Sequence, residues 1–229
     1  MAAKNVVLVH GAWGDGSHWR RVIPPLAAKG YQVTAVQNPL TSLADDIHRT
    51  TTLVNAQDGP TLLVGHSYGG AVISGAGHAP NVAGLVYVAA FAPDEGENLA
   101  GLLGRDQSTP PPEGLIRPDA DGFLWLDFDL FHQAFCADVD AEDALVMGRA
   151  QKPIAGRCFE DRAGPPAWQS KPTWYQVSTR DRMIPPTTEQ WMAERMQPRG
   201  LLTLDASHAS LASHPDEITA LITEAAESL

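Results

Sequence analysis

Short apolar runs of strand length recur along this chain. They cover residues 6–9, 31–36, 61–64, 85–90, 173–177 and 201–204. Within each run the apolar residues are nearly continuous and do not alternate with polar ones. That pattern is typical of parallel strands covered by helices on both faces. The runs therefore predict a buried parallel sheet of about six strands.

Segments of helical length lie between these runs. They cover residues 17–29, 43–57, 68–77, 187–196 and 216–228. Thr187 followed by Gln190 forms a capping box directly after two prolines, which predicts a helix start there. The alternation of strand and helix predicts an α/β fold with a doubly wound parallel sheet.

Residues 92–171 interrupt this alternation, and we predict no strand among them. The interval is rich in proline and contains Phe123, Phe128, Phe131, Phe135 and Phe159, together with Trp125 and Trp168. An acidic disordered linker is one interpretation. So many aromatic side chains favour a folded lid instead. We therefore expect a single domain over residues 1–229, with a lid inserted at residues 92–171.

The composition disfavours several classes of function and location. The 229 residues are 44% hydrophobic and carry a net charge of −11, and thirteen acids but only two arginines fall within residues 94–143. An acidic surface disfavours nucleic acid and anionic membranes as partners. Cys136 and Cys158 fit neither a disulfide framework nor a zinc site, so we expect thiols in a cytoplasmic protein. No signal peptide and no apolar run of membrane-spanning length is visible.

A nucleophile motif follows the third predicted strand. Gly65-His66-Ser67-Tyr68-Gly69-Gly70 links that strand to a helix, which is the setting of a nucleophile elbow. A sharp turn there crowds the backbone, and Gly65 and Gly69 leave room where a Cβ atom would clash. The amide of Tyr68 lies at the predicted helix start, where it favours a developing negative charge. Ser67 is therefore the candidate nucleophile.

A serine hydroxyl needs a base, and His208 is the candidate because it follows the last predicted strand. His214 competes with it, but it precedes Pro215 and a helix start, so we interpret it as a solvent-facing or capping residue. The acid should follow the penultimate strand, where Asp181 lies between Arg180 and Arg182, which would help to keep it ionised. Asp205 is the alternative acid, three residues before His208.

A second glycine-rich turn follows the first predicted strand. We expect the backbone amide of Ala12 in His10-Gly11-Ala12-Trp13-Gly14 to be the second donor to an oxyanion, beside that of Tyr68. The spacing of these glycines differs from a dinucleotide fingerprint, which makes that alternative weak. No cluster of His, Asp or Glu has metal-ligand spacing.

Together these segments resemble the α/β-hydrolase superfamily, in its small branch of plant methylesterases, hydroxynitrile lyases and bacterial esterase relatives. The similarity rests on the two turns above and on residues 85–93, 181–185, 207–208 and 213–215. The resemblance implies the α/β-hydrolase fold, a catalytic triad of Ser67, Asp181 and His208, and no cofactor. Hydroxynitrile lyases of this branch carry a threonine in place of Gly11 and a lysine in place of Ala209, so ester hydrolysis is favoured over lyase activity.

The predicted function is hydrolysis of a small, largely apolar carboxylic ester. We expect the substrate to contact His10, Trp13, His66, Trp125 and Phe128. A receptor-like ligand-binding relative with slow turnover, a lactonase and a thioesterase stay open as alternatives. The expected partner is the small-molecule substrate, and pairing into a homodimer stays open.

Overall fold

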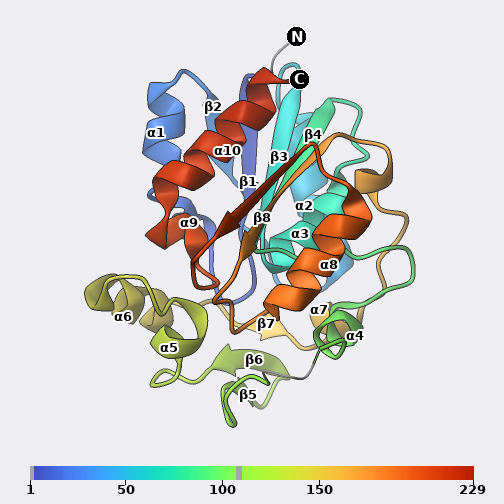
Figure 1. The fold of residues 1–229 in the computed structure, drawn as a ribbon. Helices are drawn as coiled ribbons and strands as arrows, with labels where there is room; N and C mark the ends of the chain where they lie inside the picture. The colour runs from blue at the N-terminus through green and yellow to red at the C-terminus, as the bar shows by residue number, and fades with distance from the viewer. Residues whose placement is uncertain (1–2, 107–109) are drawn as a thin grey trace.

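A six-stranded sheet forms the centre of the computed structural model, which describes residues 3–106 and 110–229 (Figure 1). The strands are β1 (Asn5–Val9), β2 (Gln32–Ala35), β3 (Thr61–His66), β4 (Val82–Val88), β8 (Thr173–Ser178) and β9 (Gly200–Leu204). They lie in the order β2-β1-β3-β4-β8-β9, and every pairing is parallel. The predicted doubly wound parallel sheet is confirmed.

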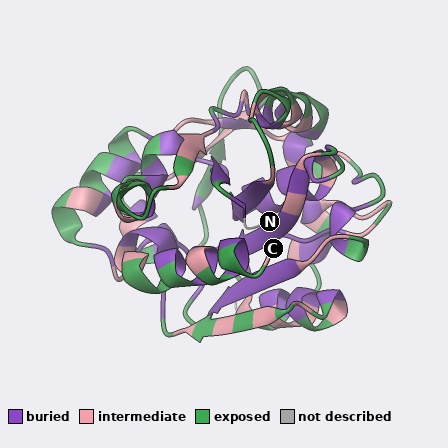
Figure 2. Cartoon of the chain, turned by 90° about the horizontal axis from the view of Figure 1, so that it is seen from above, coloured by how far each residue is buried: buried purple, intermediate pink, exposed green. Residues whose placement is uncertain are grey.

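Helices cover both faces of this sheet because successive strand side chains point to opposite sides. Val7, Leu63 and Tyr87 pack on one face with α2 (Leu43–Asn55), α3 (Tyr68–Ala76) and α8 (Pro186–Met196). Val6, Leu62 and Val86 pack on the other face with α1 (Ile23–Ala28) and α10 (Pro215–Glu227). Seen from above, the central strands and the inner sides of the helices are buried, whereas the edge strands β2 and β9 and the outer sides of the helices are more exposed (Figure 2). This two-sided burial explains the continuous apolar runs.

Two helix predictions need correction. The segment 17–29 is not one helix but a short 3₁₀ helix, η1 (Gly16–Trp19), followed by α1. Two prolines in the first turn of α1 lack the amide hydrogens that a continuous helix would need. The capping box at Thr187 is also wrong. Helix α8 begins one residue earlier, the Thr187 hydroxyl donates a hydrogen bond to Asp106, and the Gln190 amide donates one to Glu194.

Most of the chain between β4 and β8 forms a layer beyond the carboxyl ends of the strands, and its last part returns along the core to the start of β8 (Figure 1). Its helices are α4 (Leu99–Leu103), α5 (Phe131–Phe135), α6 (Ala141–Arg149), α7 (Arg157–Glu160) and η2 (Ala167–Gln169). It also contains an antiparallel sheet of β5 (Ile116–Pro118), β6 (Phe123–Leu126) and β7 (Ile154–Ala155), which corrects the expectation that no strand occurs here. Strands of two to four residues are too short to give a recognisable pattern.

The inserted segment between β4 and β8, which we expect to act as a lid, is joined to the core by specific hydrogen bonds. The indole nitrogen of Trp13 donates to the carbonyl of Leu124 at 3.0 Å, and the amide of Ala155 donates to the carbonyl of Leu40 at 2.9 Å.

Across the described ranges, no helix is long and apolar enough to cross a membrane. The remaining helix, α9 (Ser210–Ser213), follows the loop that carries His208.

Candidate active site

Ser67 lies on the turn between β3 and α3, in a backbone conformation that few residues adopt. Its φ and ψ are +54° and −124°. The turn is feasible because its neighbours are glycines: a Cβ atom at Gly65 would lie 2.6 Å from the carbonyl oxygen of Gly69, and one at Gly69 would lie 2.4 Å from that of Val9. Strain of this kind is common at functional sites. The turn lifts the Ser67 hydroxyl above the carboxyl edge of the sheet.

Three side chains from three loops meet at this edge. The Ser67 Oγ lies 2.8 Å from His208 Nε2, and His208 Nδ1 lies 2.5 Å from Asp181 Oδ2. A carboxylate only accepts, so Nδ1 carries the proton and donates to Asp181, which leaves Nε2 as the acceptor for the serine hydroxyl. All three residues are buried. Loops after β3, β8 and β9 meet here because parallel strands end at the same edge.

The Asp181 carboxylate is held by backbone amides. Its Oδ1 accepts hydrogen bonds from the amides of Met183 at 2.6 Å and Ile184 at 2.9 Å. The expectation that the flanking arginines support it is wrong. Arg180 pairs with Asp205 at 2.9 Å, and Arg182 forms no ion pair within the described part of the chain. The Asp205 side chain is 80% exposed and bonds to Arg180 and Thr179, well away from His208.

The loop that carries His208 is fixed from two sides. The amide of Ser207 donates to Asp138 Oδ2 at 2.9 Å, and the amide of Ala209 donates to the carbonyl of Phe135 at 3.1 Å, so the lid segment holds this loop. On the core side, His66 Nε2 donates to the carbonyl of His208 at 2.9 Å. Asp138 was not predicted as a site residue, because nothing in the sequence relates it to a loop about seventy residues away.

Two backbone amides near Ser67 donate to no acceptor among the described residues. Tyr68 is the first residue of α3, so its amide is one of the helix-start donors without an intrahelical partner. The amide of Ala12 donates to no acceptor among the described residues. Both residues line the same cavity as Ser67. Gly11 brings the Ala12 loop close, since a Cβ atom there would lie 2.7 Å from the Cβ of Ser67.

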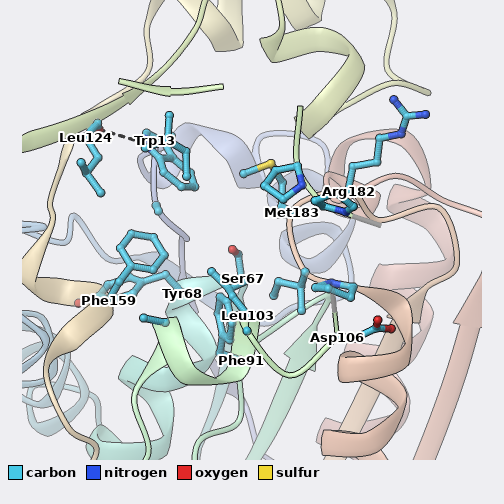
Figure 3. A pocket seen from close by; sticks show the side chains of 18 residues that line it. Trp13, Ser67, Tyr68, Phe91, Leu103, Asp106, Leu124, Phe159, Arg182 and Met183 are labelled. Atoms are coloured by element: carbon cyan, nitrogen blue, oxygen red, sulfur yellow. Dashed lines mark hydrogen bonds between the residues drawn. The ribbon is translucent and has the colours of Figure 1, made fainter. Parts of the chain in front are cut away.

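Ser67 opens onto a cavity of about 440 Å³. The Ser67 hydroxyl points into this space, with aromatic and aliphatic side chains around it (Figure 3). Among the described residues that line the cavity, Asp106 and Arg182 are charged. Asp106 accepts a hydrogen bond from Thr187, and the guanidinium of Arg182 points away from Ser67 (Figure 3). The apolar lining comprises Ala12, Trp13, Phe91, Ala100, Leu103, Pro110, Pro111, Ile116, Leu124, Phe159, Met183, Ile184 and Pro185.

Of the five residues expected to contact substrate, only Trp13 lines this cavity. His10 is fully buried, and its Nε2 accepts from the amide of Asn38 while its Nδ1 donates to the carbonyl of Gly11. His66 points down into the core against Trp19 and Phe135. The expectation that His10 and His66 contact substrate is therefore wrong, because both imidazoles form hydrogen bonds with the backbone of neighbouring loops.

The two lid aromatics predicted for substrate contact are also corrected. Trp125 follows Leu124 on β6 and points to the opposite side of that strand, where its indole nitrogen donates to Asp119 at 3.0 Å. Phe128 is 46% exposed and packs under the guanidinium of Arg149. Phe159 was not predicted to contact substrate, but it lines the cavity and packs against Trp13, with ring centroids 5.7 Å apart.

Buried histidines surround the base of the site. Burial lowers the pKa of His10 and of His18 to about 4 each, and it holds the pKa of His66 well below the ordinary value. These side chains therefore stay neutral at neutral pH. Within the described ranges, no group of three or more His, Cys, Asp or Glu side chains is arranged to hold a metal ion.

Comparisons with known proteins give the family. The model of the alpha/beta hydrolase family matches residues 6–221. The chain belongs to the α/β-hydrolase family. A pyrethroid hydrolase from Sphingobium wenxiniae is 29% identical over an alignment covering 99% of this α/β-hydrolase and 89% of that protein. Salicylic acid-binding protein 2 from Nicotiana tabacum is 24% identical, with 97% of each chain covered.

Solved structures agree with the fold. The crystal structure of a pyrethroid hydrolase from Sphingobium faniae matches with a TM-score of 0.85 at 23% identity, covering 99% of this α/β-hydrolase and 98% of that chain. The relatives include methylesterases of Arabidopsis thaliana, so the branch expected from the sequence is confirmed.

Proposed function

We propose that this α/β-hydrolase cleaves small, largely apolar carboxylic esters through an acyl-enzyme on Ser67. The observation that carries the proposal is the chain of hydrogen bonds from Asp181 through His208 to Ser67. Its Ser67 end opens into an apolar cavity. A hydroxyl, an imidazole and a carboxylate in this order form an activated nucleophile. The names of relatives support ester chemistry: one is a carbendazim hydrolysing esterase from Nocardioides and several are methylesterases.

In the first half-reaction the Ser67 oxygen attacks the ester carbonyl while His208 Nε2 removes the hydroxyl proton. The carbonyl oxygen becomes an oxyanion, which the amides of Ala12 and Tyr68 stabilise by donating hydrogen bonds. The tetrahedral intermediate collapses when the carbon–oxygen bond to the alcohol breaks and His208 gives the departing oxygen its proton. Asp181 keeps the imidazole in the required tautomer throughout.

In the second half-reaction water replaces the alcohol. His208 removes a proton from that water, the hydroxide oxygen attacks the acyl carbon, and the same two amides stabilise the second oxyanion. The bond to Ser67 then breaks, and the proton returns to the serine oxygen. The products are a carboxylic acid and the free enzyme, and no external oxidant or reductant is needed.

The cavity limits the substrate by size and polarity. A volume of about 440 Å³ is at the small end of ligand pockets, and its walls offer few groups that could pair with a charge. An ionised substituent near Ser67 would lose water without gaining a partner, which is costly. Neutral esters with compact aliphatic or aromatic groups are therefore favoured.

A panel of chromogenic esters of increasing acyl length, with matched lactones and thioesters, tests this proposal. We expect sustained turnover that is highest for short, neutral oxygen esters and is lost in the Ser67→Ala variant. A single burst without further turnover would favour the receptor-like alternative, and faster turnover of lactones or thioesters would favour those substrate classes. Equal turnover by Ser67→Ala would contradict the mechanism.

A further inference from the structure

A second carboxyl group lies behind the catalytic acid. Glu189 is in the first turn of α8 and is fully buried. Its Oε2 accepts a hydrogen bond from the amide of Ser178 at 3.0 Å. Its Oε1 is also buried, and no N–H or O–H donor among the described residues reaches it. One oxygen of this carboxyl group is thus unexplained by the surrounding donors.

Among the described side chains, the carboxyl group of Asp181 lies within hydrogen-bonding reach of Glu189. Two ionised carboxylates have only acceptors, so they can bond to each other only if one of them carries a proton. Asp181 already accepts from His208, Met183 and Ile184, which all favour its ionised form. The proton of the pair therefore belongs on Glu189.

No cation compensates for a second negative charge. Among the described residues, no Lys or Arg forms an ion pair with Asp181 or Glu189, and Arg180 forms an ion pair with Asp205. The groups that face Glu189 are Asp181 and Tyr175, and the Tyr175 hydroxyl donates to the carbonyl of Ala90. Burial and the negative charge of Asp181 hold the pKa of Glu189 well above its usual range. The start of α8 favours a carboxylate, but that effect is smaller than the cost of burying two adjacent charges.

We infer that Glu189 is a neutral glutamic acid whose hydroxyl donates a hydrogen bond to the carboxylate of Asp181, and that it acts as a positioning residue for the proposed reaction. The bond fixes the Asp181 side chain in addition to its bonds with His208, Met183 and Ile184. It also withdraws negative charge from the carboxylate, which limits how strongly Asp181 holds a protonated imidazole. The inference rests on the proposed role of Asp181 as the acid of the triad.

Two substitutions separate the hydrogen bond from the charge. Glu189→Gln matches the protonated acid, because its oxygen can accept from the Ser178 amide while its NH₂ group donates to Asp181. Glu189→Met has similar volume but no donor. Glu194→Gln is the matched control, since Glu194 is an exposed residue of the same helix whose side chain accepts a hydrogen bond from Gln190. Each variant is compared with the full-length protein by kcat, KM, the pH profile of kcat/KM and infrared spectroscopy.

We expect Glu189→Gln to keep kcat within about threefold and to leave the acid limb of the profile in place, because a neutral donor replaces a neutral donor. Glu189→Met should lower kcat roughly tenfold with little change in KM and move the acid limb to higher pH. The infrared band of a protonated carboxylic acid should be present at pH 7 in the parent and in Glu194→Gln, and absent in Glu189→Gln.

The inference is overturned if Glu189→Gln leaves that infrared band unchanged or shifts the acid limb, or if a folded Glu189→Met variant keeps the parent's kcat and profile. If Glu189→Met does not fold, the infrared comparison still decides the protonation state. Turnover by Ser67→Ala would instead refute the proposed function, and the infrared result would stand independently of it.

Discussion

Asp181 and Asp205 lie on neighbouring loops, and their surroundings give them different chemistry. Asp181 is buried and bonded to His208 and two backbone amides, whereas the Asp205 side chain is 80% exposed and bonded to Arg180. A buried carboxylate with fixed donors can hold an imidazole in one tautomer. An exposed carboxylate in an ion pair is screened by water and contributes little.

Paired substitutions of these two aspartates test the difference. Asp181→Asn keeps the shape of the side chain but can stabilise the wrong imidazole tautomer, so we expect kcat to fall by about 10⁴-fold with KM little changed. Asp205→Asn should lower kcat by about tenfold or less, because it affects only the outside of the loop. The measurement is steady-state kinetics on one chromogenic ester. The reverse order of effects would mean that the acid has been assigned wrongly.

The side-chain partners of the site could be predicted only in part. Ser67, His208 and Asp181 stand out because each follows an apolar strand run, and strand ends share one edge of a parallel sheet. The substrate contacts of His10, His66, Trp125 and Phe128 could not be read in this way, because the direction of a side chain depends on strand register and loop packing. Phe159 was missed for the same reason.

At the scale of elements, the nucleophile turn depends on how closely α3 approaches β1. A Cβ atom at Gly69 would lie 2.4 Å from the carbonyl oxygen of Val9 and 2.9 Å from that of His10. Those atoms are backbone, so they cannot rotate away as a side chain could. The same approach sets the distance between Ser67 and the backbone amide of Ala12, which we propose as an oxyanion donor.

We therefore predict that Gly69→Ala lowers the free energy of unfolding by about 3 kcal/mol and reduces kcat by displacing the Ala12 loop. Gly164→Ala is the control, because no heavy atom lies within 4 Å of a Cβ atom built there, and its effect should be within about 0.5 kcal/mol. Urea unfolding and ester turnover measure the two effects. An unchanged Gly69→Ala variant would show that the close approach is not needed.

The long elements were predictable and the short ones were not. The six core strands and helices α2, α3, α8 and α10 follow from apolar runs that burial on two faces requires. The break between η1 and α1 needed the rule that proline cannot continue a helix. Strands β5, β6 and β7 are fixed by tertiary pairing, including the bond from Ala155 to Leu40, and that information is absent from any local pattern.

At the scale of the whole molecule, burial of neutral histidines links stability to pH. His10 and His18 have a pKa lowered to about 4, and burial holds the pKa of His66 well below its ordinary value of 6.5. In the unfolded chain these imidazoles bind protons as pH falls below 6.5, but in the folded protein they do not until the pH is near 4. The unfolded state thus binds more protons in this window, and stability decreases as the pH falls.

Each of these histidines should contribute about 1.4 kcal/mol per pH unit, so the free energy of unfolding should fall by about 4 kcal/mol per unit toward the acid end of the window. Urea unfolding at several pH values between 4.5 and 7 measures the slope. His18→Phe should lower it by about one histidine's share, whereas His48→Gln, an exposed control, should leave it unchanged. A stability that is flat across this range would refute the account of neutral buried histidines.

The central claim is that Ser67 carries the acyl group during turnover. The most direct measurement is acid quenching during turnover of a short chromogenic ester, followed by digestion and mass spectrometry of the peptides. We predict an acyl adduct on Ser67 that appears within the first turnover and is absent from Ser67→Ala. An adduct on another residue, or full turnover by Ser67→Ala, would contradict the account.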